Sequence, residues 1–295
     1  MSRNAPMPSP RCTLLARRGL ARLSGPDVRP FLQGLISNDI DLLAADRPLY
    51  AALLTPQGRC LFDFILYVKC DAILLDGERD RLPALVQRLS MYRLRSKVTI
   101  EELGQEQVVL AVFGPGSELL QGRTTEFTAV TDPRLAALGT RVLLPPAAVD
   151  GFVATHDLVV APPEEYDRHR LALGVPDGSR DLVPEKALLL ESGFEELHGV
   201  SFAKGCFVGQ ELTARTKHRG LVKKRLLPVR LDGPLPAPGS QVTRAGRDAG
   251  EMRSGVEGLA LALLRLDQLR DDAAPLLAGA TELTPLTPPW LSTQL

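Results

Sequence analysis

Apolar residues at helical spacing predict several helices before residue 225. A helix-start signal at residues 24–27 (SGPD) precedes an apolar face made of Phe31, Leu32, Leu35 and Ile36. Residues 82–89 repeat this spacing and predict a short amphipathic helix. A further helix is predicted over residues 164–173, where Gly174 and Pro176 end it.

Apolar runs between these helices predict strands. Residues 60–68 form one strand, and residues 69–71 turn it into a second strand over 72–75, which makes a hairpin. Two more strands are predicted at residues 97–102 and 107–113, on either side of Gly104. Strands and helices in this mixed order, with hairpins, favour an α+β fold over a repeated βαβ sheet.

The pattern changes after Arg225. From Leu226 to Trp290, short apolar runs are split by prolines and glycines, which is typical of a small antiparallel barrel or sandwich. Residues 256–266 are rich in leucine and alanine and could form a helix by propensity alone. We therefore expect an α+β region over residues 1–225 and a separate C-terminal domain over residues 226–295.

Composition and charge narrow the class of protein. The 295 residues are 44% hydrophobic and 24% charged, which is ordinary for a soluble globular protein. Thirty-five basic residues balance 35 acidic ones, and this argues against general binding to nucleic acid or to a membrane surface. No apolar run reaches the roughly 18 residues that would span a bilayer.

The four cysteines are widely separated. Cys12, Cys60, Cys70 and Cys206 include no pair at C-x-x-C spacing, so the sequence shows no self-contained zinc or cluster site. Their scatter does not indicate a disulfide framework either, and a reducing compartment fits.

Residues 204–211 (KGCFVGQE) contain the most informative chemistry. Cys206 follows a cation and lies between two glycines, which predict an accessible loop with a close backbone approach. An accessible thiol in an electropositive place can act as a nucleophile or a metal ligand. The ordinary alternative is a buried, inert cysteine in a turn. The functional motif that we predict comprises Lys204, Gly205, Cys206, Gly209, Gln210 and Glu211.

A cationic strip follows this motif. Residues 212–225 contain six basic residues and no acid, namely Arg215, Lys217, Arg219, Lys223, Lys224 and Arg225. A solvated face is the ordinary interpretation. The functional alternative is capture of an anionic ligand, whereas nucleic acid is less suitable because the strip has no interleaved aromatic residues.

The motif and its surroundings resemble the folate-binding YgfZ family, which is related to the aminomethyltransferase (T-protein) of the glycine cleavage system. Besides residues 204–220, the resemblance rests on residues 31–39 (FLQGLISND), 55–59 (TPQGR), 92–95 (YRLR) and 132–134 (DPR), so it covers nearly the whole chain. Residues 189–192, 200–202 and 214–216 are most similar to the branch that contains the iron–sulfur assembly factor Iba57. Phe207 departs from the tyrosine that is usual in the family.

This resemblance implies an aminomethyltransferase-like folate-binding fold with a C-terminal antiparallel β-barrel, and a strand at residues 256–266. It also implies that the α+β region over residues 1–225 is made of two interwoven subdomains. It also implies tentative folate-binding positions at Asn38, Asp63, Tyr92, Arg95 and Arg215. Asp63 lies in an otherwise apolar strand and therefore needs a partner or a purpose. Two departures argue against aminomethyl transfer: Phe62 replaces one of a pair of aspartates, and Ala172 replaces the glutamate that grips the pterin ring.

The function implied is assembly or repair of iron–sulfur clusters for [4Fe–4S] enzymes, without catalysis, beside an A-type iron–sulfur carrier. Cys206 would be a tentative ligand of a transient cluster shared with that carrier, since one thiolate cannot hold a cluster alone. Tetrahydrofolate is a possible cofactor. The alternatives are a folate-dependent aminomethyltransferase, which activity with a lipoyl-bound aminomethyl donor would reveal, and a plain folate-binding module.

Location is inferred from the amino terminus. Residues 1–18 are basic and lack the apolar stretch of a secretory signal. They could pass for a transit peptide, but the resemblance begins at about Thr13 and leaves little room for one. We expect a bacterial cytoplasmic protein, with the mitochondrial matrix as the alternative.

Overall fold

The structure is a computed structural model that describes residues 9–120, 122–124, 126–220, 222–270 and 274–291. The chain forms two compact units that alternate along the sequence. Unit 1 comprises Met1–Val28, Asp41–Leu49 and Ile65–Tyr166, and unit 2 comprises Arg29–Ile40, Tyr50–Phe64 and Asp167–Leu295. The predicted boundary between residues 225 and 226 stays a prediction, because these units divide the chain along other lines.

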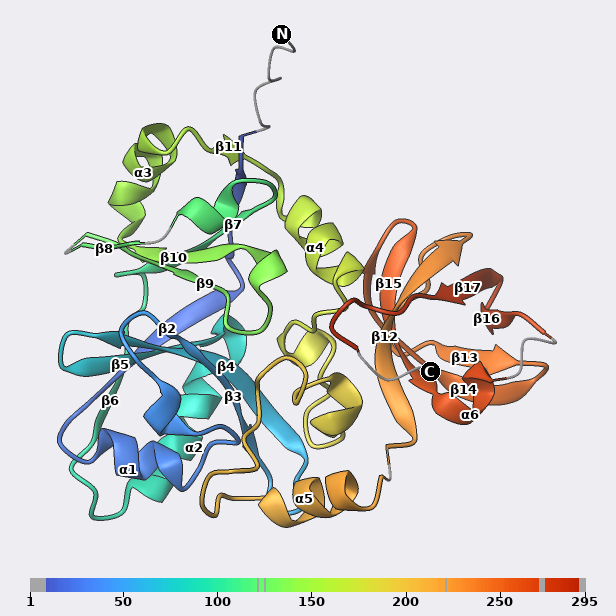
Figure 1. Ribbon diagram of the computed structural model, residues 1–295, viewed down its shortest axis with the longest axis horizontal. Helices are drawn as coiled ribbons and strands as arrows, with labels where there is room; N and C mark the ends of the chain where they lie inside the picture. The colour runs from blue at the N-terminus through green and yellow to red at the C-terminus, as the bar shows by residue number, and fades with distance from the viewer. Residues whose placement is uncertain (1–8, 121, 125, 221, 271–273, 292–295) are drawn as a thin grey trace, which may run out of the picture. The chain divides into compact units, whose positions relative to one another are not determined.

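A six-stranded sheet lies within unit 1 (Figure 1). Its order is β11 (Val159–Val160), β1 (Arg11–Leu14), β7 (Val108–Phe113), β10 (Thr140–Leu144), β9 (Thr128–Thr131) and β8 (Gly122–Arg123). Strand β1 pairs with β11 in parallel and with β7 antiparallel. Helix α3 (Val149–Thr155) contributes Phe152 to an apolar core with Leu110, Val112 and Val142. Cys12 lies in this core, and burial raises the pKa of its thiol.

A five-stranded sheet has the order β3 (Leu49–Leu54), β4 (Cys60–Lys69), β5 (Ala72–Glu78), β2 (Arg18–Ser24) and β6 (Thr99–Glu102). The predicted hairpin is confirmed as β4 and β5, which pair antiparallel up to Lys69 and Ala72. Helix α2 (Leu82–Arg93) is also confirmed, and it buries Leu82, Leu85 and Leu89 at the spacing that predicted it.

The helix predicted after residues 24–27 is shorter than its apolar pattern. Helix α1 (Val28–Gln33) ends before Leu35 and Ile36, although both of these residues are buried. Ile36 instead forms a β-bridge with Leu53. The apolar face therefore extends beyond the end of the helix. Ile36 N still donates to Leu32 O at 3.0 Å, and Ser37 N donates to Ala52 O of strand β3 at 2.9 Å.

The C-terminal residues form a closed antiparallel barrel in unit 2, drawn in orange and red in Figure 1. Its order is β12 (Lys224–Asp232), β15 (Leu259–Arg265), β14 (Arg247–Val256), β13 (Gln241–Arg244), β16 (Leu276–Ala278) and β17 (Thr281–Pro285). The strand expected within residues 256–266 is present as β15, since Gly258 turns the chain back from β14. Val229, Val242, Met252 and Leu264 are among the residues of the barrel core.

The described residues also form the α-helices α4 (Pro163–Ala172), α5 (Gln210–His218) and the single turn α6 (Leu266–Leu269). Helix α4 confirms the helix predicted at residues 164–173 to within one residue at each end. Within the described ranges, no helix combines the length and apolar character that a membrane crossing requires.

Candidate functional site

Cys206 lies on a loop that leads into helix α5, in unit 2. Its side chain is exposed, and the structure shows a free thiol, as the flanking glycines and the distant cysteines predict. In the described parts of the chain, no group of three or more His, Cys, Asp or Glu side chains could hold a metal ion.

Two of the other resemblance motifs pack against this loop. Ser201 N donates to Ser37 O at 3.0 Å, and Val208 N donates to Gly34 O at 3.3 Å. The hydroxyl of buried Ser37 donates to Gly199 O at 2.6 Å and accepts from Ala52 N at 2.8 Å. Residues 31–39 thus form the support on which the Cys206 loop rests.

Lys204 fixes the loop most firmly. Its Nζ donates to Gln33 O at 2.8 Å, Ile36 O at 2.7 Å and Asn38 O at 2.8 Å. The ammonium also lies 5.0 Å from the centre of the Phe207 ring, within the range of a cation–π contact. Lys204 therefore satisfies the carbonyl of the last residue of α1 and two carbonyls of the segment that follows, and these contacts give it a structural role next to Cys206.

Gly209 and Gly58 bring the second motif, residues 55–59, against the start of α5. Gly209 has a φ of +80°, and a Cβ atom there would collide with Thr55 O and lie 3.0 Å from Gly58 Cα. Gly58 has a φ of +73°, and its Cβ would lie 2.8 Å from Gly209 O. Two glycines thus allow a backbone contact that no side chain would permit.

Gly205 differs from Gly209. A Cβ atom on Gly205 would meet nothing within 4 Å, so the close backbone approach expected from the sequence holds only for Gly209. The open space lies directly beside Cys206 in the sequence and leaves this side of the loop uncovered.

Gln210 and Glu211 open helix α5. Gln210 N donates to Phe207 O, and its Oε1 accepts from Phe207 N, both at 3.2 Å. This reciprocal pair closes the turn that contains Gly209. Glu211 is exposed in the first turn, where a carboxylate is favourable for the helix dipole.

Asn38 and Asp63 are held inside unit 2. The Asn38 amide donates to Tyr50 O and His198 O, both at 2.7 Å, and its Oδ1 accepts from Asp39 N at 2.9 Å. Buried Asp63 accepts a hydrogen bond of 3.1 Å from the Tyr50 hydroxyl, which is the partner that an acid in this strand requires. Their contact with folate stays a prediction.

Tyr50 is a residue that the sequence reasoning missed. It is buried and stacks on Phe194 with 4.8 Å between ring centres. Its hydroxyl donates to Asp63, and its backbone carbonyl accepts from the Asn38 amide, so Tyr50 connects these two residues. The available signal was weak, namely a tyrosine at the start of a strand that is otherwise aliphatic.

The remaining tentative folate residues lie apart from this cluster along the chain. Tyr92 is half-buried near the end of α2, and exposed Arg95 lines a shallow hollow with Asp27, Leu94 and Ser96, all in unit 1. Arg215 is exposed on α5 in unit 2.

Ion pairs occupy part of the cationic strip. Lys217 pairs with Glu195 and lies 4.0 Å from the centre of the Phe202 ring. Arg225 binds Glu196 Oε1 and Leu190 O, both at 2.8 Å. These two cations are therefore structural, which leaves fewer charges for an anionic ligand than the sequence predicts.

Glu191 lies among the same cations. Burial raises its pKa, and Lys224, Arg59 and Arg225 oppose the rise. The sequence signal that could have indicated these pairs is the acidic run at residues 191–196, which precedes the basic strip.

A buried ionic network lies in unit 1 and includes the residues of the 132–134 motif. Arg141 binds Asp76 at 2.6 Å and Asp132 at 3.3 Å. Arg18 binds Asp76 at 2.7 Å, and Arg134 binds Asp132 at 2.8 Å. Burial would raise the pKa of Asp132, but Arg134 and Arg141 outweigh it and lower the pKa to about 2. This motif is therefore structural in its contacts.

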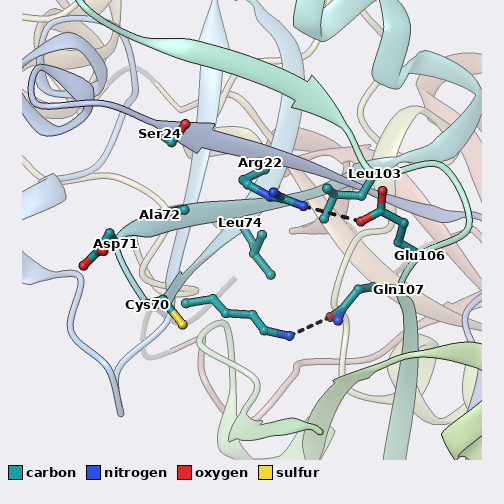
Figure 2. Close-up of a pocket in the computed structure, with 10 residues that line it drawn as sticks. Arg22, Ser24, Cys70, Asp71, Ala72, Leu74, Leu103, Glu106 and Gln107 are labelled. Carbon is teal, nitrogen blue, oxygen red and sulfur yellow. Dashed lines mark hydrogen bonds and ion pairs between the residues drawn. The ribbon is translucent and has the colours of Figure 1, made fainter. Parts of the chain in front are cut away.

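Figure 2 shows a pocket in unit 1, and its lining includes Cys70 and its neighbours in the β4–β5 turn. The volume of this pocket is about 340 Å³. Arg22 binds Glu106 at 3.4 Å, and Lys69 donates to Gln107 at 3.2 Å across it. Cys70 is exposed and free, so it is a second accessible thiol. None of the predicted site residues lines this pocket.

Comparisons with known proteins identify the family. Residues 223–293 match the family described as CAF17, C-terminal beta-barrel domain. The iron-sulfur cluster assembly factor IBA57, mitochondrial, of Mus musculus is 38% identical over 96% of this chain and 86% of its own length. The chain belongs to the IBA57 family. The human relative of the same name is also 38% identical, over 96% of this chain and 85% of its own length.

A solved structure supports the fold. The aminomethyltransferase T of the glycine cleavage system from Bartonella henselae aligns with a TM-score of 0.73, over 96% of this chain and 86% of its own, at 16% identity. The IBA57-like chain therefore has an aminomethyltransferase-like fold with a C-terminal barrel, as the resemblance implied. The cytoplasmic location gains no support from these IBA57 relatives, which are named mitochondrial.

Proposed function

We propose that this chain is an iron–sulfur cluster assembly factor, and that Cys206 supplies one ligand to a cluster held jointly with a carrier protein. The observation that carries the proposal is an exposed, free thiol on a loop that Lys204 and Gly209 fix in place. Its relatives are named as assembly factors, which supports the general function.

The geometry favours shared ligation over a cluster bound by this chain alone. Thiolates are the usual ligands of iron–sulfur clusters, and a cluster needs several of them. The described residues include no group of three or more His, Cys, Asp or Glu side chains that could hold a metal ion. The partner proposed is an A-type iron–sulfur carrier with cysteines of its own, and the clients are [4Fe–4S] enzymes.

The described residues do not offer a good grip for folate. The Asn38 amide is committed to backbone carbonyls, Asp63 is bonded to Tyr50, and Ala172 has no polar group to hold a pterin. The proposed function therefore involves neither a folate-dependent step nor aminomethyl transfer. Calorimetry with tetrahydrofolate at two salt concentrations checks this: weak, salt-sensitive binding through exposed Arg215 fits, whereas tight, salt-independent binding does not.

The compartment proposed is one that keeps thiols reduced, because all four cysteines are free. The mitochondrial matrix and a bacterial cytoplasm both meet this condition, and the names of the relatives favour the former.

The test is to mix the protein with a cluster-loaded A-type carrier and to follow complex formation by visible absorption and circular dichroism. The wild-type protein should give a stable complex with a changed cluster spectrum, and Cys206→Ala should lose that change while keeping its far-ultraviolet spectrum. Cys70→Ala is the matched control, since Cys70 is also exposed and free. If Cys206→Ala forms the same coloured complex as wild type, Cys206 is not a ligand.

A further inference from the structure

A second pocket, of about 430 Å³, lies beside the barrel in unit 2. Strand β14 forms one wall, the loop at residues 235–239 forms another, and Ser179, Arg180 and Val183 close the third. Its volume is within the range of about 300–1,000 Å³ that is usual for small-molecule sites.

Arg253 on β14 gives this pocket its chemistry. The pairing of β14 with β15 shifts register between Met252 and Gly255, so Arg253 lies in a β-bulge. Bulges at barrel rims commonly redirect a side chain. The Arg253 side chain is only 8% exposed, and Nη1 donates to Met252 O at 3.0 Å and to Glu251 Oε1 at 2.5 Å.

The Nε–H of Arg253 is buried and finds no acceptor among the described residues. A buried donor without an acceptor is unfavourable, so the site favours a molecule that supplies one. Arg180, the other arginine in the pocket wall, is already paired with Asp167 at 2.8 Å and with Asp177 at 3.1 Å. Of the two arginines in this wall, Arg253 is therefore the one whose guanidinium has an unpaired buried donor.

The rest of the wall is largely apolar. Leu235, Pro236, Pro238 and Met252 line the pocket, and Leu235 is 44% exposed although it is a large apolar residue. A compact apolar group placed here would cover this surface and would gain from its removal from water.

We propose that this pocket binds a small carboxylate with a compact apolar body. A small movement of the Arg253 side chain would open its Nε and Nη2 edge to the pocket. The two carboxylate oxygens would then accept from this edge, since a guanidinium offers two parallel donors that match a carboxylate. The apolar body would lie against Leu235 and the two prolines. Glu251 is the internal competitor, because its carboxylate holds Nη1 and its side chain is 47% exposed. The proposal is independent of cluster assembly.

Benzoate is the probe, and the full-length protein is the sample. The ¹⁵Nε–¹Hε signals of arginine side chains are recorded during titration, and Arg253 is assigned through the signal that disappears in Arg253→Lys. Benzoate should shift this signal in a saturable way, whereas neutral benzamide should leave it nearly unchanged. An equal shift with benzamide, or no saturation in the millimolar range, would overturn the proposal.

Two variants separate binding from folding. Arg253→Lys keeps the charge and loses the paired donors, so benzoate affinity measured by calorimetry should fall by about tenfold or more. Glu251→Gln removes the competing carboxylate and should tighten benzoate binding several-fold, an effect that a damaged fold would not produce. Unchanged affinity in Arg253→Lys, or weaker binding in Glu251→Gln, contradicts the assignment, and thermal melts of both variants establish that they are folded.

Discussion

At the scale of single residues, the ammonium of Lys204 holds the Cys206 loop on the segment that follows α1. Three backbone carbonyls accept from it, and in a half-buried place such charge-assisted hydrogen bonds are stronger than neutral ones. The loop is therefore ordered before any partner arrives. Preorganisation of this kind reduces the cost of binding.

Lys204→Met should destabilise the protein by about 2–4 kcal/mol, because the three carbonyls lose a common charged donor. The measurement is the urea-unfolding free energy of the variant and the wild type. Lys217→Met is the matched control, since Lys217 is 38% exposed and its pair with Glu195 should contribute about 1 kcal/mol or less. Equal losses in the two variants would mean that Lys204 is an ordinary surface lysine.

At the scale of elements, the start of α5 depends on a backbone contact with residues 55–59. Gly209→Ala should destabilise the protein by about 2 kcal/mol or more, because φ is +80° and the new Cβ would collide with Thr55 O. Gly205→Ala should leave the stability nearly unchanged, since open space surrounds that position. Thermal melts of the two variants give the comparison, and a Gly209→Ala protein as stable as Gly205→Ala would refute the close contact.

The elements that the sequence predicts well are those whose pattern is local. Helix α2 and the β4–β5 hairpin were predictable because apolar spacing and a two-residue turn lie within one short segment. The early end of α1 was not predictable in this way, because the donor that caps it, Lys204, lies far along the chain. The anchoring role of Lys204 was not predictable either. Because Lys204 lies two residues from Cys206 in the sequence, its charge suggested an effect on the thiol instead.

The same distinction applies to the site. An exposed Cys206 could be predicted from the glycines around it. The individual ion pairs of Lys217 and Arg225 could not, because the acidic run at residues 191–196 and the basic strip do not reveal which acid folds against which cation. Arg253 was also missed, since its buried Nε depends on a bulge that only the barrel register shows.

At the scale of the whole molecule, a buried ionic network should make unit 1 sensitive to acid. Its buried network has two carboxylates for three guanidiniums, namely Asp76 and Asp132 with Arg18, Arg134 and Arg141. Both carboxylates have lowered pKa values, and that of Asp132 is about 2. A carboxylate with a lowered folded-state pKa stabilises the protein above its unfolded-state pKa of about 3.9, and that stability is lost as the pH falls toward the folded value.

Asp132 alone should account for about 2 kcal/mol of stability that is present at pH 5 and above and disappears between about pH 4 and pH 2. Hydrogen exchange detected by mass spectrometry, corrected for the intrinsic effect of pH, can follow β9 and β10 separately from the barrel strands. Protection of β9 and β10 should fall over this range in the wild-type protein.

Asp132→Asn should be less stable at neutral pH by about 3 kcal/mol and should show a flatter acid dependence, because a buried ion pair has lost one partner. Asp267→Asn is the control, because it changes a fully exposed carboxylate paired with Arg265, and it should match wild type throughout. If the acid dependence of β9 and β10 is unchanged in Asp132→Asn, the buried network does not control the acid sensitivity of these strands.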